Sequence, residues 1–149
     1  MSSPDTRVPD AARLLRLIAS TKSEFDTLAQ QMRNDRRVHR VDHDFDCYGH
    51  SDDFPTQPNG IVDWWIEFET YSGESRCGSL TLFWDNAAWQ IEIKLTRPED
   101  DGPQAMAELP CYEASDVAGC IMHLPRALQT LVTAMRAALD ELSGATSAR

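Results

Sequence analysis

Residues 61–71 read IVDWWIEFETY, and their alternation of apolar and polar side chains decides the fold class. A period of two places Val62, Trp64, Ile66 and Phe68 on one face of a strand and the intervening residues on the other. Residues 78–84 and 88–96 alternate in the same way, with inward sets Leu80, Leu82 and Trp84, and then Trp89, Ile91, Ile93 and Leu95. Asp85-Asn86-Ala87 between them is a turn sequence, which predicts a β-hairpin. Such clean alternation is typical of an antiparallel sheet that is covered on one face only.

Two amphipathic helices flank these strands and can supply the cover. The first is predicted from Pro9 or Asp10 to Arg33, with Asp10 as its N-cap and one apolar stripe at helical spacing. A second long helix ends at Gly144 and carries the stripe Leu128, Leu131, Val132, Met135, Leu139 and Leu142. Pro125 interrupts it, so either a short helix at 116–123 precedes the long one or the long one begins at Pro125.

Residues 38–48 complete the sheet as its first strand. One face takes His39, Val41, His43, Phe45 and Cys47, and the other takes Arg40, Asp42, Asp44, Asp46 and Tyr48. Residues 49–60 form a loop, and 106–112 form a short edge strand that Pro110 weakens. The predicted fold class is therefore α+β: a two-layer, four- or five-stranded antiparallel sheet covered on one face by N- and C-terminal helices. We expect one domain over residues 1–149, with flexible tails at 1–9 and 144–149.

The composition is strongly acidic, with a formal net charge of −10. Such a charge repels nucleic acids and anionic membranes and attracts basic proteins. The N-terminus shows no secretory signal, no apolar run has the length of a membrane span, and the four cysteines lack C-x-x-C spacing. The sequence therefore predicts a cytoplasmic protein with reduced thiols, a basic protein partner, and no nucleic acid or membrane partner.

The cluster HRVDHDFD at 39–46 is the one candidate for metal or enzyme chemistry. Residues four apart on a strand are separated by about 13 Å, so His39 and His43 cannot share one ion unaided. Any metal site would combine His43, Asp44 and His50. The alternative function is therefore a metal-dependent small-molecule-binding protein or enzyme that uses the His39, His43, His50 and aspartate cluster. No nucleotide-binding or nucleophile motif is present, so no cofactor and no catalytic residue is predicted.

The outer sheet face favours protein binding instead. It would collect Asp63, Glu67, Glu69 and Glu92 around Trp65 and Phe83, together with Asp42, Asp44 and Asp46 if the first strand has the same orientation. Large aromatic side chains ringed by charges are typical of partner-binding patches, unless another element covers this face and makes Trp65 part of the core.

The main hypothesis is a non-enzymatic protein-binding domain that presents this acidic, aromatic-studded face to a basic partner. Immunity proteins that neutralise toxins and chaperones of secreted effectors have this general composition and architecture, although no motif assigns the chain to either class. Self-association through the face would bring like charges together, so we expect a monomer or a weak homodimer.

Overall fold

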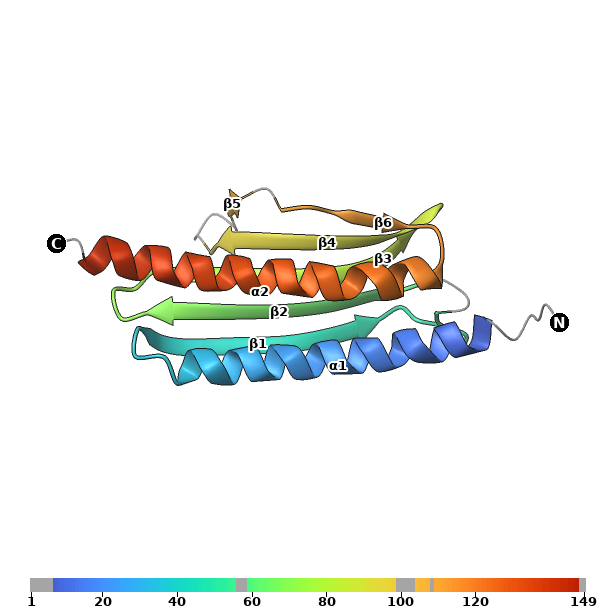
Figure 1. Cartoon of the computed structure of the whole chain (residues 1–149), viewed down its shortest axis with the longest axis horizontal. Helices are drawn as coiled ribbons and strands as arrows, with labels where there is room; N and C mark the ends of the chain where they lie inside the picture. Colours follow the sequence, from blue (N-terminus) through green and yellow to red (C-terminus); the bar gives the residue numbers. More distant parts are fainter. Residues whose placement is uncertain (1–6, 56–58, 99–103, 108, 148–149) are drawn as a thin grey trace.

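The computed structural model describes residues 7–55, 59–98, 104–107 and 109–147 of the 149-residue chain. The elements run in the order α1 (Arg7–Arg33), β1 (Val38–Tyr48), β2 (Ile61–Thr70), β3 (Ser75–Asp85), β4 (Ala88–Arg97), β5 (Gln104–Ala107), β6 (Tyr112–Ala114) and α2 (Val117–Ser147). The predicted α+β class is confirmed: two terminal helices pack against an antiparallel sheet five strand positions wide (Figure 1).

The sheet is a meander in which β1, β2, β3 and β4 pair in chain order, each antiparallel to the last. Two short strands share the fifth position: β5 pairs with the Leu95–Arg97 end of β4, and β6 pairs with its Trp89–Ile91 end. The edge strand predicted at 106–112 is therefore wrong in its bounds. Pro110 lies between β5 and β6 because proline has no amide hydrogen for a ladder.

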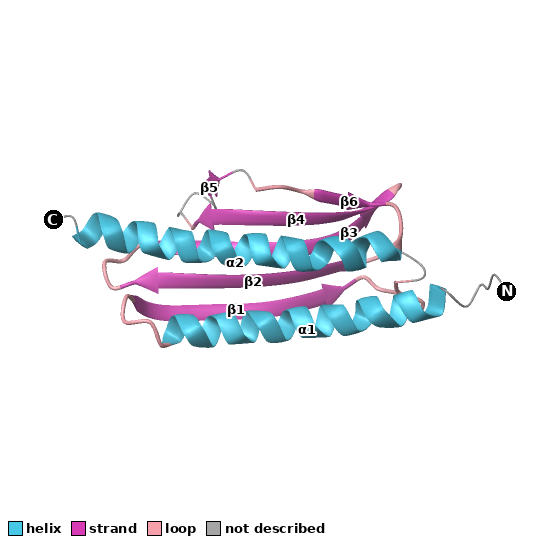
Figure 2. Cartoon of the chain, viewed as in Figure 1, coloured by secondary structure: helices cyan, strands magenta, loops and turns pink. Residues whose placement is uncertain are grey.

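Both helices lie on the same side of the sheet (Figure 2). α1 packs on β1 and β2, α2 packs on β3, β4 and β6, and the two helices contact each other. Trp64 of β2 is fully buried beneath them, with its ring centroid 6.5 Å from that of Phe25 and 5.7 Å from that of Phe45. These three rings join α1, β1 and β2 into one core.

Gly78 allows α2 to lie close to β3. A Cβ atom at this position would lie 2.6 Å from Sδ of Met135 and 2.8 Å from Cδ1 of Leu131. Both distances are well below van der Waals contact, so the missing side chain sets the separation between the helix and the strand.

The helix ends and the role of Pro125 differ from the predictions. α1 begins at Arg7, so Asp10 lies in its first turn rather than at the N-cap. α2 continues through Pro125 and through Gly144 to Ser147, so both predicted arrangements around Pro125 are wrong. Residues 7–9 and 144–147 belong to these helices rather than to the predicted tails.

Burial explains why α2 is not broken. Leu124 and Ala127, on either side of Pro125, are both fully buried, as is Leu131. Burying each leucine is worth about 1.5–3 kcal/mol, so the two together offset the roughly 3 kcal/mol that proline costs inside a helix. Within the described residues, neither helix has the length and hydropathy of a membrane span.

Candidate functional site

The face of the sheet opposite the helices collects the acidic residues of three strands. We name it the acidic face and define it by Asp42, Asp44, Asp46, Asp63, Trp65, Glu67, Glu69, Phe83 and Glu92. The strand register brings these residues into rows, because Asp42 lies opposite Glu67, Asp44 opposite Trp65 and Asp46 opposite Asp63. Across β3 and β4, Thr81 lies between Asp63 and Glu92. Period-two geometry therefore places all of them on one side of the sheet.

The acidic face is open in the described part of the chain. Every helix–strand contact is made on the opposite face, where alternate residues of β2 are buried. Trp65 and Phe83 are partly exposed, and Asp42, Asp44 and Asp46 are exposed. The alternative in which another element buries Trp65 is not what the described residues show.

Negative charge dominates the acidic face. Arg40 lies 3.8 Å from carboxylate oxygens of both Asp42 and Glu69, and Lys94 lies 3.9 Å from Glu92. Exposed pairs at such distances contribute about 1 kcal/mol or less. The seven carboxylates of the face are thus only weakly compensated by these two cations.

The carboxylate of Asp63 lies on the acidic face and has a raised pKa. Partial burial raises its pKa, and the charge of Asp46 across the ladder raises it further. A 2.8 Å hydrogen bond from the hydroxyl of Thr81 and the charge of Lys94 oppose this rise. Asp63 is therefore a partly buried carboxylate that binds its proton more tightly than a free one.

The thiol on this face is not a nucleophile at neutral pH. Burial, together with the charges of Glu67 and Asp63, raises the pKa of Cys77 to about 11. The thiolate is the reactive form of cysteine, and it is scarce four units below the pKa.

The three histidines of the alternative hypothesis do not share a site. His39 packs against Tyr71 with ring centroids 5.0 Å apart. His43 lies on the helix side of the sheet, with Nε2 2.8 Å from Asp26, whereas Asp44 points to the acidic face. In the described residues, no group of three or more histidine, cysteine or acidic side chains could hold a metal ion.

His50 instead forms a close pair with Cys47 that the sequence did not predict. The thiol sulfur lies 2.8 Å from Nδ1 of His50, and the imidazole ring stacks on Phe54. Burial raises the pKa of Cys47 and lowers the pKa of His50, so both groups favour their neutral forms. Nucleophilic catalysis by a cysteine–histidine pair needs the opposite ionisation, so this pair does not support an enzymatic role.

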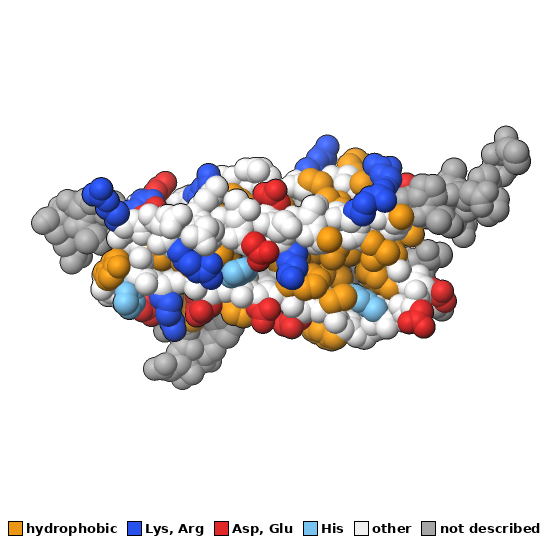
Figure 3. All heavy atoms as spheres, turned by 90° about the horizontal axis from the view of Figure 1, so that it is seen from below, with side chains coloured by type: hydrophobic (Ala, Val, Ile, Leu, Met, Phe, Trp, Pro, Cys, Tyr) orange, Lys and Arg blue, Asp and Glu red, His pale blue; other side chains and the backbone are white. Residues whose placement is uncertain are grey.

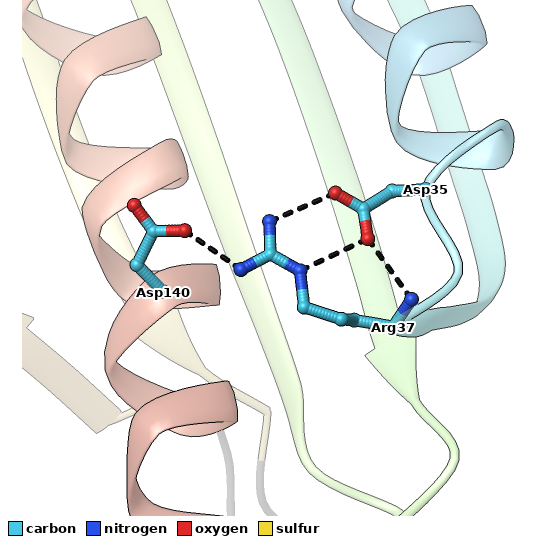
Figure 4. A network of polar contacts seen from close by, with 3 residues as sticks. All are labelled: Asp35, Arg37 and Asp140. Carbon is cyan, nitrogen blue, oxygen red and sulfur yellow. Dashed lines mark hydrogen bonds and ion pairs between the residues drawn. The ribbon is translucent and has the colours of Figure 1, made fainter. Parts of the chain in front are cut away.

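A second unpredicted cluster joins the α1–β1 turn to α2 (Figure 4). The guanidinium of Arg37 donates to both carboxylate oxygens of Asp35, at 3.0 and 2.8 Å, and to Asp140 at 2.7 Å. The adjoining cavity of about 350 Å³ lies between the two helices, and its other arginine, Arg136, donates to Gln31 at 2.7 Å. Both arginines already have acceptors. The cluster therefore holds α2 to the α1–β1 turn and is not an anion-binding site.

The interaction of Arg37 with Asp35 predicts that the loss of folding stability caused by Arg37→Ala depends on pH. The hydrogen bond from Arg37 holds the pKa of Asp35 below its usual value. A lowered folded-state pKa stabilises the fold above the unfolded pKa of about 3.9, and this contribution is lost as the pH falls through the folded pKa. We expect Arg37→Ala to lower the free energy of unfolding by about 1 kcal/mol or less at pH 7, because the groups are partly exposed. The difference between the wild-type chain and the variant should shrink towards about pH 3.

Urea denaturation at several pH values measures this difference. Arg136→Ala is the matched control, because it removes a hydrogen bond to the neutral Gln31 from the same cavity and should show no such pH dependence. A cost of Arg37→Ala that stays constant from pH 7 to about pH 3 would contradict the role assigned to Asp35.

The chain matches no protein-family model, no curated protein and no solved structure.

Proposed function

We propose that the chain is a non-enzymatic protein-binding domain that receives a basic protein partner on its acidic face. One observation carries this proposal: both helices cover the same side of the sheet, and the other side displays seven carboxylates around two partly exposed aromatic rings. The hydrophobic core does not require Trp65 or Phe83 at these outward positions, because Trp64 and Leu82 already fill the inward ones.

The two kinds of side chain would serve different steps of binding. The carboxylates attract a cationic partner over a distance and raise the association rate, in a manner that salt weakens. Trp65 lies between Asp44 and Ser79 in the sheet and can bury its ring against the partner once the complex has formed. The rings would thus supply affinity, while the charges supply steering and specificity.

Two classes of basic partner suit such a face. One is a toxin that the chain neutralises, as an immunity protein does, and the other is a secreted effector that it chaperones. In both classes the acidic chain masks a basic surface, so the same face and the same tests apply.

Trp65→Ala tests the proposal. A partner captured from the source cells is identified, purified and titrated against the wild-type chain and the variant by calorimetry. We expect Trp65→Ala to weaken binding at least tenfold, which is the loss of about 1.4 kcal/mol of binding free energy. Tyr71→Ala is the matched control, because Tyr71 is 71% exposed in the turn after β2 and is not part of the acidic face. Equal affinities of the two variants would refute the proposed surface.

A charge variant tests the steering role. The triple substitution Asp42→Asn, Asp44→Asn and Asp46→Asn removes three exposed charges from one strand. We expect it to lower the association rate and to reduce the dependence of that rate on salt, because these exposed carboxylates attract the partner before contact. Stopped-flow kinetics at low and high salt measures both, and an unchanged salt dependence would contradict the role of the charges.

A further inference from the structure

β1 is an edge strand whose outer backbone groups pair with no other described strand. The amide of Phe45 donates instead to the carboxylate of its own neighbour Asp44, at 2.8 Å. Because alternate residues of an antiparallel strand turn their backbone groups to the same side, this bond places the N–H and C=O groups of Val41, His43, Phe45 and Cys47 at the free edge. An 11-residue strand thus offers a row of backbone donors and acceptors.

The two sides of this edge differ in chemistry. On one side, Asp42, Asp44 and Asp46 project from alternate positions, about 7 Å apart along the strand. On the other side, α1 lies over β1 and encloses a crevice of about 110 Å³, whose lining includes Lys22, Phe25, Asp26, His43, Phe45 and Trp64. Figure 3 views the molecule from the side of α1 and β1, and shows hydrophobic side chains gathered at the surface there.

One residue of the crevice lining has a polar atom without a partner. Trp64 is fully buried, and its indole N–H has no acceptor among the described residues. A buried donor without an acceptor costs about 1–3 kcal/mol.

We propose that β1 receives an extended segment of the basic partner, which adds to the sheet as a further antiparallel strand. This inference rests on the proposed function, since it specifies how the partner of the acidic face binds. The added strand would carry Lys or Arg at alternate positions facing Asp42, Asp44 and Asp46, and smaller apolar side chains beneath α1. Strand addition of this kind gains affinity from backbone hydrogen bonds and specificity from alternate side chains.

The register favours these ion pairs. The hydrogen-bonded positions of the new ladder would be Val41, His43, Phe45 and Cys47, so the aspartates would occupy the non-hydrogen-bonded positions. Opposite residues approach to about 4.5 Å between Cα atoms at such positions, which brings their side chains closest together. Binding would also transfer the Phe45 amide from Asp44 to a partner carbonyl and release Asp44 to pair with a cation.

A second copy of the chain is a poor occupant of the edge. Two β1 strands related by a two-fold axis would place the three aspartates of one copy opposite those of the other. Like charges directly opposite each other destabilise a sheet, so the edge selects a partner of opposite charge.

Synthetic peptides test this inference. An eight-residue peptide of alternating Lys and Val is titrated into the full chain by calorimetry and compared with a block isomer that has four Lys followed by four Val. We expect the alternating peptide to bind at least tenfold more tightly, because only its lysines can meet all three aspartates. The triple Asn variant of Asp42, Asp44 and Asp46 should abolish this preference.

Backbone methylation separates strand addition from simple charge attraction. In the proposed register the valine amides of the peptide point at β1 and its lysine amides point away. Methylation of the valine amide nitrogens should weaken binding at least tenfold, whereas methylation of the lysine amide nitrogens should change it less than threefold. Failure of the alternating peptide to bind, or equal effects of the two methylations, would overturn strand addition. The comparison of Trp65→Ala with Tyr71→Ala against the purified partner would still decide the proposed function on its own.

Discussion

Trp64→Ala is expected to lower the free energy of unfolding by about 3–5 kcal/mol, which is the usual cost of removing a large aromatic side chain from a core. Trp64 is fully buried and contacts Phe25 of α1 and Phe45 of β1. Its removal would therefore loosen the helix and both strands at once. Because small domains have a total stability of about 5–15 kcal/mol, this loss would remove a large part of it. Urea denaturation followed by circular dichroism measures the loss.

The adjacent residue provides the control. Trp65 has the same side chain on the same strand, but it points to the acidic face and is partly exposed. Trp65→Ala should cost about 1 kcal/mol or less, the usual value of a cross-strand aromatic contact. Similar losses for the two variants would mean that the two faces of β2 are equally buried, which would remove the basis of the proposed function.

Gly78→Val should cost about 3 kcal/mol, at the upper end of the range for overpacked cores. A Cβ atom alone would overlap Met135 and Leu131, and the two methyl groups of valine add to this overlap. Met135 and Leu131, which are both fully buried, would have to take other rotamers, or α2 would have to move away from β3. Differential scanning calorimetry should show a large fall in the melting temperature.

Ser79→Val is the matched control for this substitution. Ser79 is the next residue of β3 and lies on the acidic face, where no described helix packs. Valine favours strands, so this variant should be neutral within about 0.5 kcal/mol or slightly stabilised. If Gly78→Val were as well tolerated as Ser79→Val, the close approach of α2 to β3 would be wrong.

The sequence predicted the sheet because its signal is local. Alternation along β2 alone separates Trp64 from Trp65, and the structure places them on opposite faces as expected. The continuous path of α2 through Pro125 was not predictable from the local pattern, because it depends on how completely Leu124 and Leu131 are buried by distant strands. The division of the last sheet position between β5 and β6 likewise depends on pairing with β4.

The acidic face was predictable from the same alternation, whereas the polar clusters were not. Arg37 and Asp140 are 103 residues apart, and Asp26 and His43 are 17 apart, so only the packing of helices on strands brings them together. Conversely, His39 and His43 are close in the sequence but have separate partners, because a strand holds residues four apart too far from each other to share one.

The two borders of the sheet are unequal, and this inequality bears on stoichiometry. The border beyond β4 is split between two short segments of four and three residues, with Pro110 between them, and offers no long uninterrupted ladder. Among the residues that the structure describes, only the β1 border has the length to accept a whole extended segment. In the proposed mode of binding, each chain would therefore accept one extended segment directly, which predicts complexes with one segment of partner per chain.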